Sequence, residues 1–390
     1  MGRQAVILAG GFGTRLSHIV SDVPKPMAPV KQIPFLDYII KVLKNNGFDN
    51  FVFLTGYKSE IIENYYKELG NAVFVKEETA LGTGGALLNA YRHLADEFFV
   101  INGDTFFDID YSLLENFGKN KPCSIALRYT QNVKRYGFVE INEKFKVTSF
   151  IEKGELPENR IDGYINGGIY YIKKSVLSNF INSFKGEFIS LETEIFSEIL
   201  KNGQLYAVPV GGYFIDIGIP EDYYKAQNSI PEWMNKKLKP ALFIDKDGTL
   251  IVNTEYPHGK DFSIIQSTID IVKRYSELNY YLIIVTNQAG IAKNKFNFSQ
   301  MYEGFEGIKE YYNTNFGIKF DDIEYCPYHK DGIIKEYSHA SLLRKPNPGM
   351  ILKACEKFKI DLKNSIMIGD NTEIDKIHLP YLKCEILTGV

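Results

Sequence analysis

The sequence has few cysteines, little excess charge and no long apolar run, and each of these absences excludes a class of protein. Four cysteines among 390 residues stand at scattered positions and do not match the framework of a disulfide-rich secreted domain. The formal net charge of −3 gives no reason to expect the basic surface that nucleic-acid binding requires. The longest apolar runs, such as residues 280–285, are far shorter than the roughly 20 residues of a membrane helix.

The amino terminus also lacks a targeting signal. Residues 1–4 lead directly into a predicted strand, without the basic and apolar segments of an export peptide. Val6 stands where a myristoylation signal has Ser or Thr. We therefore expect a cytoplasmic protein that binds neither membranes nor nucleic acid, and a homo-oligomer is compatible with the sequence.

What is present is an alternation of short apolar strands and helical patterns, which is typical of parallel sheets covered by helices. The composition changes between Asn228 and Pro240, which hold two prolines, the only tryptophan and several lysines. We predict an α/β fold of two doubly wound, Rossmann-like domains at 1–230 and 241–390, joined by a linker at 231–240. Predicted strands include 5–8, 51–55, 98–102, 241–244, 281–286 and 365–369, and predicted helices include 35–46, 61–69, 301–315 and 350–359.

The first group of motifs begins with a glycine-rich turn. The run Gly10-Gly11-Phe12-Gly13-Thr14-Arg15 places small residues and free N–H groups where a backbone can approach phosphates. Arg15 and Lys25 add positive charge suited to a triphosphate. A plain glycine turn between a strand and a helix is the simpler interpretation, but Lys25-Pro26-Met27 follows at close range and favours a phosphate site.

Together with further motifs, this turn makes residues 1–227 resemble the sugar-phosphate nucleotidyltransferase family. The further motifs are Leu81-Gly82-Thr83-Gly84-Gly85-Ala86, Asn102-Gly103-Asp104, Tyr136-Gly137-Phe138-Val139, Phe150-Ile151-Glu152-Lys153, Asn166-Gly167-Gly168-Ile169-Tyr170 and Tyr213-Phe214-Ile215-Asp216-Ile217-Gly218. The segments 21–29 and 214–223 resemble D-glycero-D-manno-heptose 1-phosphate guanylyltransferases in particular.

The resemblance implies roles for individual residues. Asp104 and Asp216 are expected to hold Mg²⁺, although an aspartate after a strand is also an ordinary cap or turn residue. The sugar phosphate would attack the α-phosphorus directly, with Arg15 and Lys25 as the catalytic cations. The nucleotide is expected at Leu8, Gly10, Gly11, Gly13, Thr14, Glu78, Gly82 and Asp104, and the sugar phosphate at Gly137, Glu152, Lys153 and Asn166.

The choice of base depends on Glu77 and Glu78, which precede the motif at Leu81. A carboxylate at this place can accept hydrogen bonds from the N1 and N2 hydrogens of guanine. A solvated acidic pair at a strand end is the competing interpretation. The resemblance to the guanylyltransferases favours GTP.

A second group of motifs begins after the apolar strand 241–244. Asp245 and Asp247 stand two residues apart and are followed by Gly248-Thr249. Thr286-Asn287-Gln288, Lys345 and Gly369-Asp370 follow in that order. With these fragments residues 240–390 resemble the haloacid dehalogenase phosphatase superfamily. The runs Val285-Thr286-Asn287-Gln288-Ala289-Gly290-Ile291-Ala292 and Arg344-Lys345-Pro346 resemble the heptose bisphosphate and histidinol phosphate phosphatases in particular. Each fragment alone could be a capping Asp, a turn Thr or a surface Lys.

This second resemblance implies a phosphoenzyme mechanism. Asp245 would be the nucleophile, and Asp247 would protonate the leaving alkoxide and later activate water. Lys345 would balance the charge of the phosphoenzyme. Mg²⁺ is expected at the side chains of Asp245 and Asp370 and at the backbone carbonyl of Asp247, and the phosphorylated substrate at Thr286, Asn287 and Arg344.

One departure concerns a structural zinc loop that this subgroup commonly carries as Cys-x-His followed by Cys-x-Cys. The corresponding positions here are Cys326-Pro327-Tyr328 and Ser341-Leu342-Leu343, so three of the four ligands are missing. His329 and His339 lie nearby, but their spacing does not restore the pattern. We therefore expect no zinc.

The two resemblances together indicate a bifunctional enzyme. The phosphatase would remove the 7-phosphate of D-glycero-D-manno-heptose 1,7-bisphosphate, and the transferase would make GDP-heptose from the 1-phosphate and GTP. Two alternatives stay open: the same pair of activities on a hexose phosphate with another nucleotide, or one inactive domain that serves as a regulatory or scaffold module.

Overall fold

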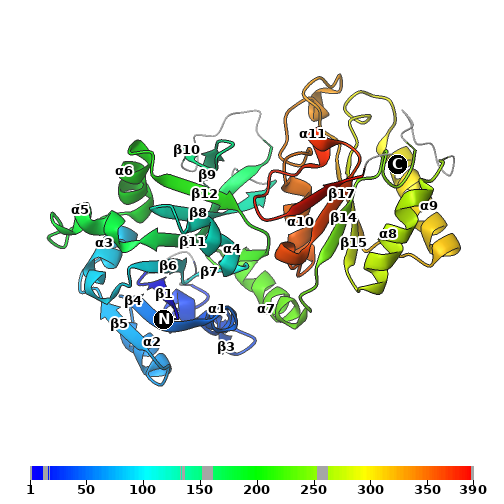
Figure 1. Cartoon of the computed structure of the whole chain (residues 1–390). Helices are drawn as coiled ribbons and strands as arrows, with labels where there is room; N and C mark the ends of the chain where they lie inside the picture. Colours follow the sequence, from blue (N-terminus) through cyan, green and yellow to red (C-terminus); the bar gives the residue numbers. More distant parts are fainter. Residues whose placement is uncertain are drawn as a thin grey trace. The chain divides into compact units, whose positions relative to one another are not determined.

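The computed structural model describes residues 2–11, 16, 18–131, 133, 137–151, 161–252 and 262–387 (Figure 1). The chain divides into two compact units. The first ends at Asn235 and the second begins at Lys236, and the described residues 129–131, 133 and 161–163 group with the second. Both units are α/β folds, as the alternating pattern predicts.

The first unit is built on a sheet of nine strands among the described residues, in the order β10-β9-β11-β6-β1-β4-β5, with β8 paired to β11 and β12 paired to β8. The strands are β1 (Arg3–Ala9), β4 (Phe48–Thr55), β5 (Ala72–Lys76), β6 (Glu97–Asn102), β8 (Cys123–Thr130), β9 (Phe138–Ile141), β10 (Val147–Ile151), β11 (Gly163–Lys173) and β12 (Leu205–Pro209). Strands β5, β4, β1 and β6 are parallel, and β11 is antiparallel to β6. Two small antiparallel pairs are β2 (Pro29–Val30) with β3 (Ile33–Pro34), and β7 (Thr105–Asp108) with β13 (Tyr213–Asp216).

The helices of the first unit are α1 (Phe35–Asn45), α2 (Ser59–Tyr66), α3 (Gly82–Asn89), α4 (Tyr111–Gly118), α5 (Ser178–Ile181), α6 (Phe196–Lys201) and α7 (Pro220–Asn235). Helix α7 continues into the stretch that the sequence assigns to a linker. Trp233 near its end is buried, stacks on Tyr213 and donates a hydrogen bond to Asp108 at 2.7 Å. These contacts attach the end of the helix to the first unit.

In the part of the second unit that the structure describes, five parallel strands form a sheet in the order β16-β15-β14-β17-β18. Its strands are β14 (Ala241–Ile244), β15 (Tyr281–Asn287), β16 (Asp322–Cys326), β17 (Ile366–Gly369) and β18 (Lys383–Ile386), and its helices are α8 (Gln266–Glu277), α9 (Phe298–Phe316), α10 (Gly349–Lys357) and α11 (Thr372–Asp375). Figure 1 shows α8 and α9 on one side of the strands and α10 on the other. The core beneath α8 and α9 is apolar, with Val272, Ile308 and Tyr312 against Leu242 and Ile244.

The predicted elements are confirmed to within a few residues at their ends. The apolar run at 281–286 forms β15 because it is buried on both faces of a parallel sheet, where strands read as continuous apolar segments. The helical spacing at 35–46 forms α1, whose apolar side chains are buried. Within the described part of the chain, no helix is long and apolar enough to cross a bilayer.

Candidate active sites

The carboxyl ends of three parallel strands of the first unit form the floor of a cavity. Leu8 of β1 lies opposite Leu54 of β4 and Asn102 of β6 in the strand register, and all three line a cavity of about 290 Å³. The other lining residues are Gly10, Gly11, Glu77, Ala80, Gly82, Thr83, Ala86, Asp104 and Phe188. This is the edge of an open α/β sheet at which ligands usually bind.

Glycine is required where the chain crosses the floor of this cavity. The N–H of Gly103 donates to the carbonyl of Leu8 at 2.9 Å, and a Cβ at residue 103 would lie 2.6 Å from that oxygen. Gly103 therefore lets the chain pass close to β1 and brings Asp104 to the cavity. This close approach explains why the motif Asn102-Gly103-Asp104 has glycine at its centre.

One lysine lies between two aspartates beside the cavity. Strands β7 and β13 pair so that Thr105 lies opposite Asp216, which brings Asp104 and Asp216 together from positions far apart in the sequence. The Nζ atom of Lys25 lies 2.6 Å from Oδ2 of Asp104 and 3.5 Å from Oδ1 of Asp216. Two carboxylates and one ammonium leave a net charge of −1 and an oxygen-only donor set, which fits a hard divalent cation.

The two neighbouring acids before α3, Glu77 and Glu78, lie in different environments. Glu77 lines the cavity and accepts a hydrogen bond from the N–H of Leu81 at 3.0 Å, and burial raises the pKa of its carboxyl group. A Cβ at Gly10 or Gly56 would lie 2.4 or 2.7 Å from Oε1 of Glu77, so both glycines make room for it. The Glu78 side chain is 83% exposed and lies 3.9 Å from Lys76. The structure therefore assigns the cavity position to Glu77, whereas Glu78 is the solvated carboxylate.

Asn166 has a defined orientation in strand β11. Its Oδ1 atom accepts from the N–H of Gly168 at 3.0 Å, and its Nδ2 atom donates to the hydroxyl of Tyr170 at 2.8 Å. Gly168 has a φ of +72°, and a Cβ there would lie 2.8 Å from Nδ2 of Asn102. Only glycine combines this backbone conformation with so close a contact. Oδ1 of Asn102 is buried without a hydrogen-bond partner among the described residues.

Several predicted residues lie outside the described part of the chain. These are Gly13, Thr14 and Arg15 of the glycine-rich turn and Glu152 and Lys153 of the sugar-phosphate motif. Gly137 is described and is partly exposed at the start of β9. The assignments of these residues stay predictions.

The second unit places a buried lysine between two aspartates. The Nζ atom of Lys345 lies 2.5 Å from Oδ1 of Asp245 and 2.7 Å from Oδ1 of Asp375. Burial is the largest influence on Asp245 and raises the pKa of its carboxyl group to about 6, while the attraction of Lys345 lowers it. Asp375 is fully buried and also accepts from the N–H of Asn371 at 3.0 Å. The motif analysis missed Asp375, which follows Gly369-Asp370 by five positions.

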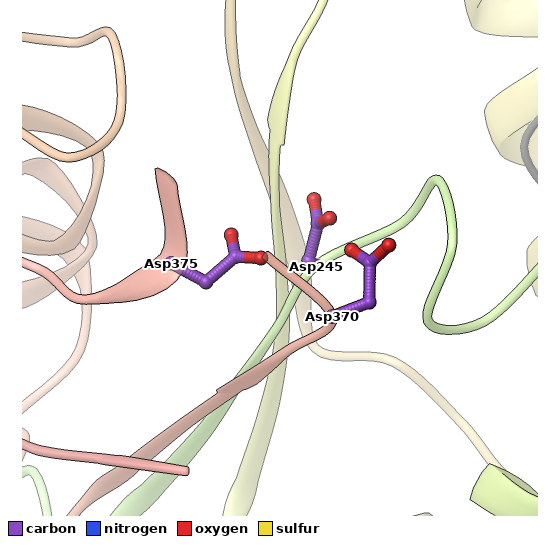
Figure 2. A group of neighbouring side chains, drawn as sticks. All are labelled: Asp245, Asp370 and Asp375. Atoms are coloured by element: carbon purple, nitrogen blue, oxygen red, sulfur yellow. The ribbon is translucent and has the colours of Figure 1, made fainter. Parts of the chain in front are cut away.

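Three carboxylates converge at the carboxyl ends of β14 and β17. Figure 2 shows Asp245, Asp370 and Asp375, whose ligand oxygens all lie within 4.8 Å of one another. Gly248 has a φ of +88°, and a Cβ there would lie 2.3 Å from Oδ2 of Asp370, so glycine keeps this space open. Burial raises the pKa of Asp370. A set of carboxylate oxygens at this spacing fits a divalent cation.

Asp247 lies beside this carboxylate group rather than within it. Its Oδ1 atom accepts from Nζ of Lys246 at 2.5 Å, and its Oδ2 atom accepts from Nε2 of Gln288 at 3.2 Å. Gln288 also donates to Oγ1 of Thr286 at 2.8 Å. The hydroxyl of Thr249 is buried without a partner among the described residues. These contacts occupy the carboxylate of Asp247, whereas its predicted metal contact is through the backbone carbonyl and stays a prediction. Asp375 joins the carboxylate group.

Asn287 and Arg344 flank the buried lysine. Asn287 exchanges two hydrogen bonds with the backbone of Lys345, accepting from its N–H at 3.0 Å and donating to its carbonyl at 3.3 Å. This arrangement makes Asn287 a support for Lys345, although the sequence suggests a substrate contact. Arg344 is partly buried, and its Nη1 atom has no hydrogen-bond partner among the described residues.

The segment that replaces the zinc loop is held by apolar and aromatic contacts. Cys326 is buried, and burial raises the pKa of its thiol to about 12. Leu343 is buried, and Tyr328 packs against His339 and Tyr337. Among the described residues, the group of three possible metal ligands is the aspartate group above, and it includes neither Cys326 nor a histidine.

Comparison with known proteins follows the division into two parts. Residues 4–232 match the nucleotidyl transferase family, and residues 240–378 match the polynucleotide kinase 3 phosphatase family. The D-glycero-alpha-D-manno-heptose 1-phosphate guanylyltransferase of Campylobacter jejuni is 41% identical over 224 residues, covering 57% of this chain and 97% of the relative. The enzyme of the same name from Aneurinibacillus thermoaerophilus is 37% identical over 237 residues, covering 59% of this chain and 100% of the relative.

A solved structure is similar to the same part of the chain. HddC from Yersinia pseudotuberculosis is 34% identical with a TM-score of 0.51, and the match covers 58% of this chain and 99% of HddC. HddC has also been solved in complex with GMP-PN. The matches to both parts confirm the combination of a nucleotidyltransferase domain with a phosphatase-family domain that the motifs predict.

Proposed function

Because the chain belongs to the nucleotidyl transferase family and also carries a phosphatase-family domain, we propose that it is a bifunctional enzyme of nucleotide-activated heptose synthesis. It removes the 7-phosphate of D-glycero-D-manno-heptose 1,7-bisphosphate and transfers GMP from GTP to the resulting 1-phosphate. The observation that carries the proposal is the presence of both sites in one chain, since the product of the second is the substrate type of the first. The use of GTP in the reaction favours a cytoplasmic location.

In the transferase site, an oxygen of the sugar 1-phosphate attacks the α-phosphorus of GTP. The new P–O bond forms while the bond from the α-phosphorus to the β-phosphate oxygen breaks, and pyrophosphate leaves. Lys25, held between Asp104 and Asp216, would stabilise the charge that develops on the α-phosphate. Asp104 and Asp216 would hold Mg²⁺, which would neutralise phosphate charge.

The preference for GTP rests on Glu77. Its carboxylate lines the cavity, and a carboxylate can accept from both N1–H and N2–H of guanine. Adenine offers no such pair of adjacent donors, so the partly buried carboxylate would gain no hydrogen bond from the base beyond the one that it accepts from Leu81. The guanylyltransferase names of the relatives point to the same base.

In the phosphatase site, a carboxylate oxygen of Asp245 attacks the phosphorus of the 7-phosphate. The bond from phosphorus to the sugar oxygen breaks, and Asp247 donates a proton to that oxygen. Water then attacks the aspartyl phosphate and loses a proton to Asp247, which releases inorganic phosphate. Asp245, Asp370 and Asp375 would hold Mg²⁺, which would reduce the repulsion between the nucleophile and the phosphate.

One coupled assay tests the whole proposal. Purified protein receives the heptose bisphosphate and Mg²⁺ with GTP, ATP, UTP or CTP in separate reactions, and a parallel set contains a hexose bisphosphate instead. We expect phosphate in every reaction with the heptose bisphosphate, and pyrophosphate with GTP above the other nucleotides. Phosphate release from a hexose bisphosphate but not from the heptose bisphosphate would contradict the substrate, and phosphate without pyrophosphate from any nucleotide would contradict the transferase step.

A further inference from the structure

A small hydrogen-bond network joins the cavity loop at the start of α3 to Asn166 in β11, and Glu192 lies at its centre. The hydroxyl of Tyr170 donates to Oε1 of Glu192 at 3.3 Å. The hydroxyls of Thr83 and Ser190 donate to Oε2 at 3.0 and 3.4 Å. Asn166 completes the network by donating to the Tyr170 hydroxyl.

The donor and the acceptor of each hydrogen bond in the network are determined, because each hydroxyl has only one hydrogen to donate. The Tyr170 oxygen accepts from Asn166, and the Thr83 oxygen accepts from the N–H of Leu191 at 2.9 Å. Both hydroxyl hydrogens then go to Glu192, and a carboxylate can accept both because it has no hydrogen to give. Full burial raises the pKa of Tyr170 well above its ordinary value, so the phenol keeps its hydrogen.

The direction of the network determines how Asn166 is turned. Its Oδ1 atom faces the N–H of Gly168 and its Nδ2 atom faces Tyr170. The reversed amide would place an NH₂ group against the N–H of Gly168, and an oxygen against a hydroxyl whose hydrogen is already used. The observed orientation leaves one amide hydrogen and one carbonyl lone pair that no described residue uses.

We propose that Glu192 is a positioning residue for the sugar phosphate, acting through Tyr170 to hold Asn166 in the orientation that binds sugar hydroxyls. This inference rests on the proposed function and on the sugar-binding role that the family resemblance implies for Asn166. The same carboxylate also holds Thr83, which lines the nucleotide cavity. Glu192 thus connects Asn166, through Tyr170, to a residue of the nucleotide cavity, and it is not itself among the residues that line that cavity.

The backbone around Glu192 is fixed independently of its side chain. The N–H of Ile189 donates to the carbonyl of Leu81 at 2.8 Å, and the N–H groups of Gly84 and Gly85 donate to the carbonyl of Ile189 at 2.9 and 3.0 Å. These bonds attach the segment before Glu192 to the cavity loop. We therefore expect side-chain variants of Glu192 to fold.

The test compares variants that remove or keep the acceptor. Glu192→Met has a similar length but no acceptor, Glu192→Gln keeps one acceptor for Tyr170, and Tyr170→Phe removes the hydroxyl. The matched control is Glu198→Gln, whose side chain is 52% exposed on α6. Pyrophosphate formation by the full chain is measured against heptose 1-phosphate and GTP in turn, with circular dichroism as a check on folding.

We expect the KM for heptose 1-phosphate to rise about tenfold in Glu192→Met and in Tyr170→Phe, which corresponds to one lost hydrogen bond. We expect a smaller rise in Glu192→Gln, and a change below about threefold in the KM for GTP. The double variant Glu192→Met/Tyr170→Phe should be no worse than either single variant, because both interrupt one chain of hydrogen bonds. An unchanged KM for the sugar, or effects that multiply in the double variant, would overturn the inference.

A second measurement does not depend on turnover. In protein labelled with ¹⁵N-asparagine, the side-chain amide resonance of Asn166 is identified by its loss in Asn166→Asp. It should move in Glu192→Met and Tyr170→Phe and stay in place in Glu198→Gln. If wild-type protein makes no pyrophosphate, the proposed function fails and this resonance still decides the network. If wild-type protein is active and the resonance does not move in the variants, the inference alone fails.

Discussion

Replacing Asp245, the proposed nucleophile of the second unit, should abolish one activity, spare the other and stabilise the fold. Asp245→Asn removes the carboxylate that we propose attacks phosphorus, so phosphate release should stop. Pyrophosphate formation from supplied heptose 1-phosphate should be nearly unchanged, because the residues that contact Asp245 belong to the second unit. Loss of both activities would contradict the assignment of two separate sites.

The expected gain in stability follows from the burial of Asp245. Its pKa rises from the ordinary value of 3.8 to about 6, which corresponds to about 3 kcal/mol and already includes the attraction of Lys345. Because the folded-state pKa is the higher one, protonated Asp245 favours folding. That contribution is complete below the unfolded value and is lost as the pH rises through about 6. Asn is neutral at every pH, so the variant avoids this loss.

Differential scanning calorimetry of the full chain in EDTA tests this reasoning. For a unit of this size, about 3 kcal/mol corresponds to a rise of roughly 6–12 °C in the melting temperature at pH 7.5. The difference should shrink to about 1 kcal/mol at pH 4.5. The control Asp270→Asn removes an exposed aspartate from α8 and should change little. Equal melting of Asp245→Asn and wild-type protein at pH 7.5 would refute the argument from burial.

Three further predictions concern Lys25, the choice of nucleotide and the absence of zinc. Lys25→Ala should reduce pyrophosphate formation by about 10²–10³ and leave phosphate release unchanged, and a loss below threefold would contradict its role. Glu77→Gln should reduce the preference for GTP over ATP, and a competition assay with both nucleotides measures this preference. The control Glu78→Gln changes an exposed side chain and should leave the preference unchanged. Equal effects of the two substitutions would refute the assignment to Glu77. Protein purified without added zinc should contain none by metal analysis and still release phosphate with Mg²⁺, and activity that returns with zinc but not with magnesium would show a missed site.

The local sequence was sufficient for the strands and helices that it predicted and for the families that the two domains resemble. Strand β15 and helix α1 follow from apolar runs and spacings that lie within one element. The motifs around Asp104 and Asp245 are also local, because each places an acid directly after a buried strand. Such patterns need no knowledge of the residues that pack against them.

Only the tertiary structure decided which of two neighbouring acids lines the cavity and which distant residues share a site. Glu77 and Glu78 are equivalent in the sequence, but the turn after β5 directs only Glu77 into the cavity, in the space left by Gly10 and Gly56. Asp375 joins Asp245 because the chain after β17 folds back on that strand. No sequence motif singled out Glu192. The backbone hydrogen bonds between its segment and the loop at Leu81 bring its carboxylate to the hydroxyl of Tyr170. In each case the contact joins residues that are far apart in the sequence, so a local sequence pattern cannot predict it.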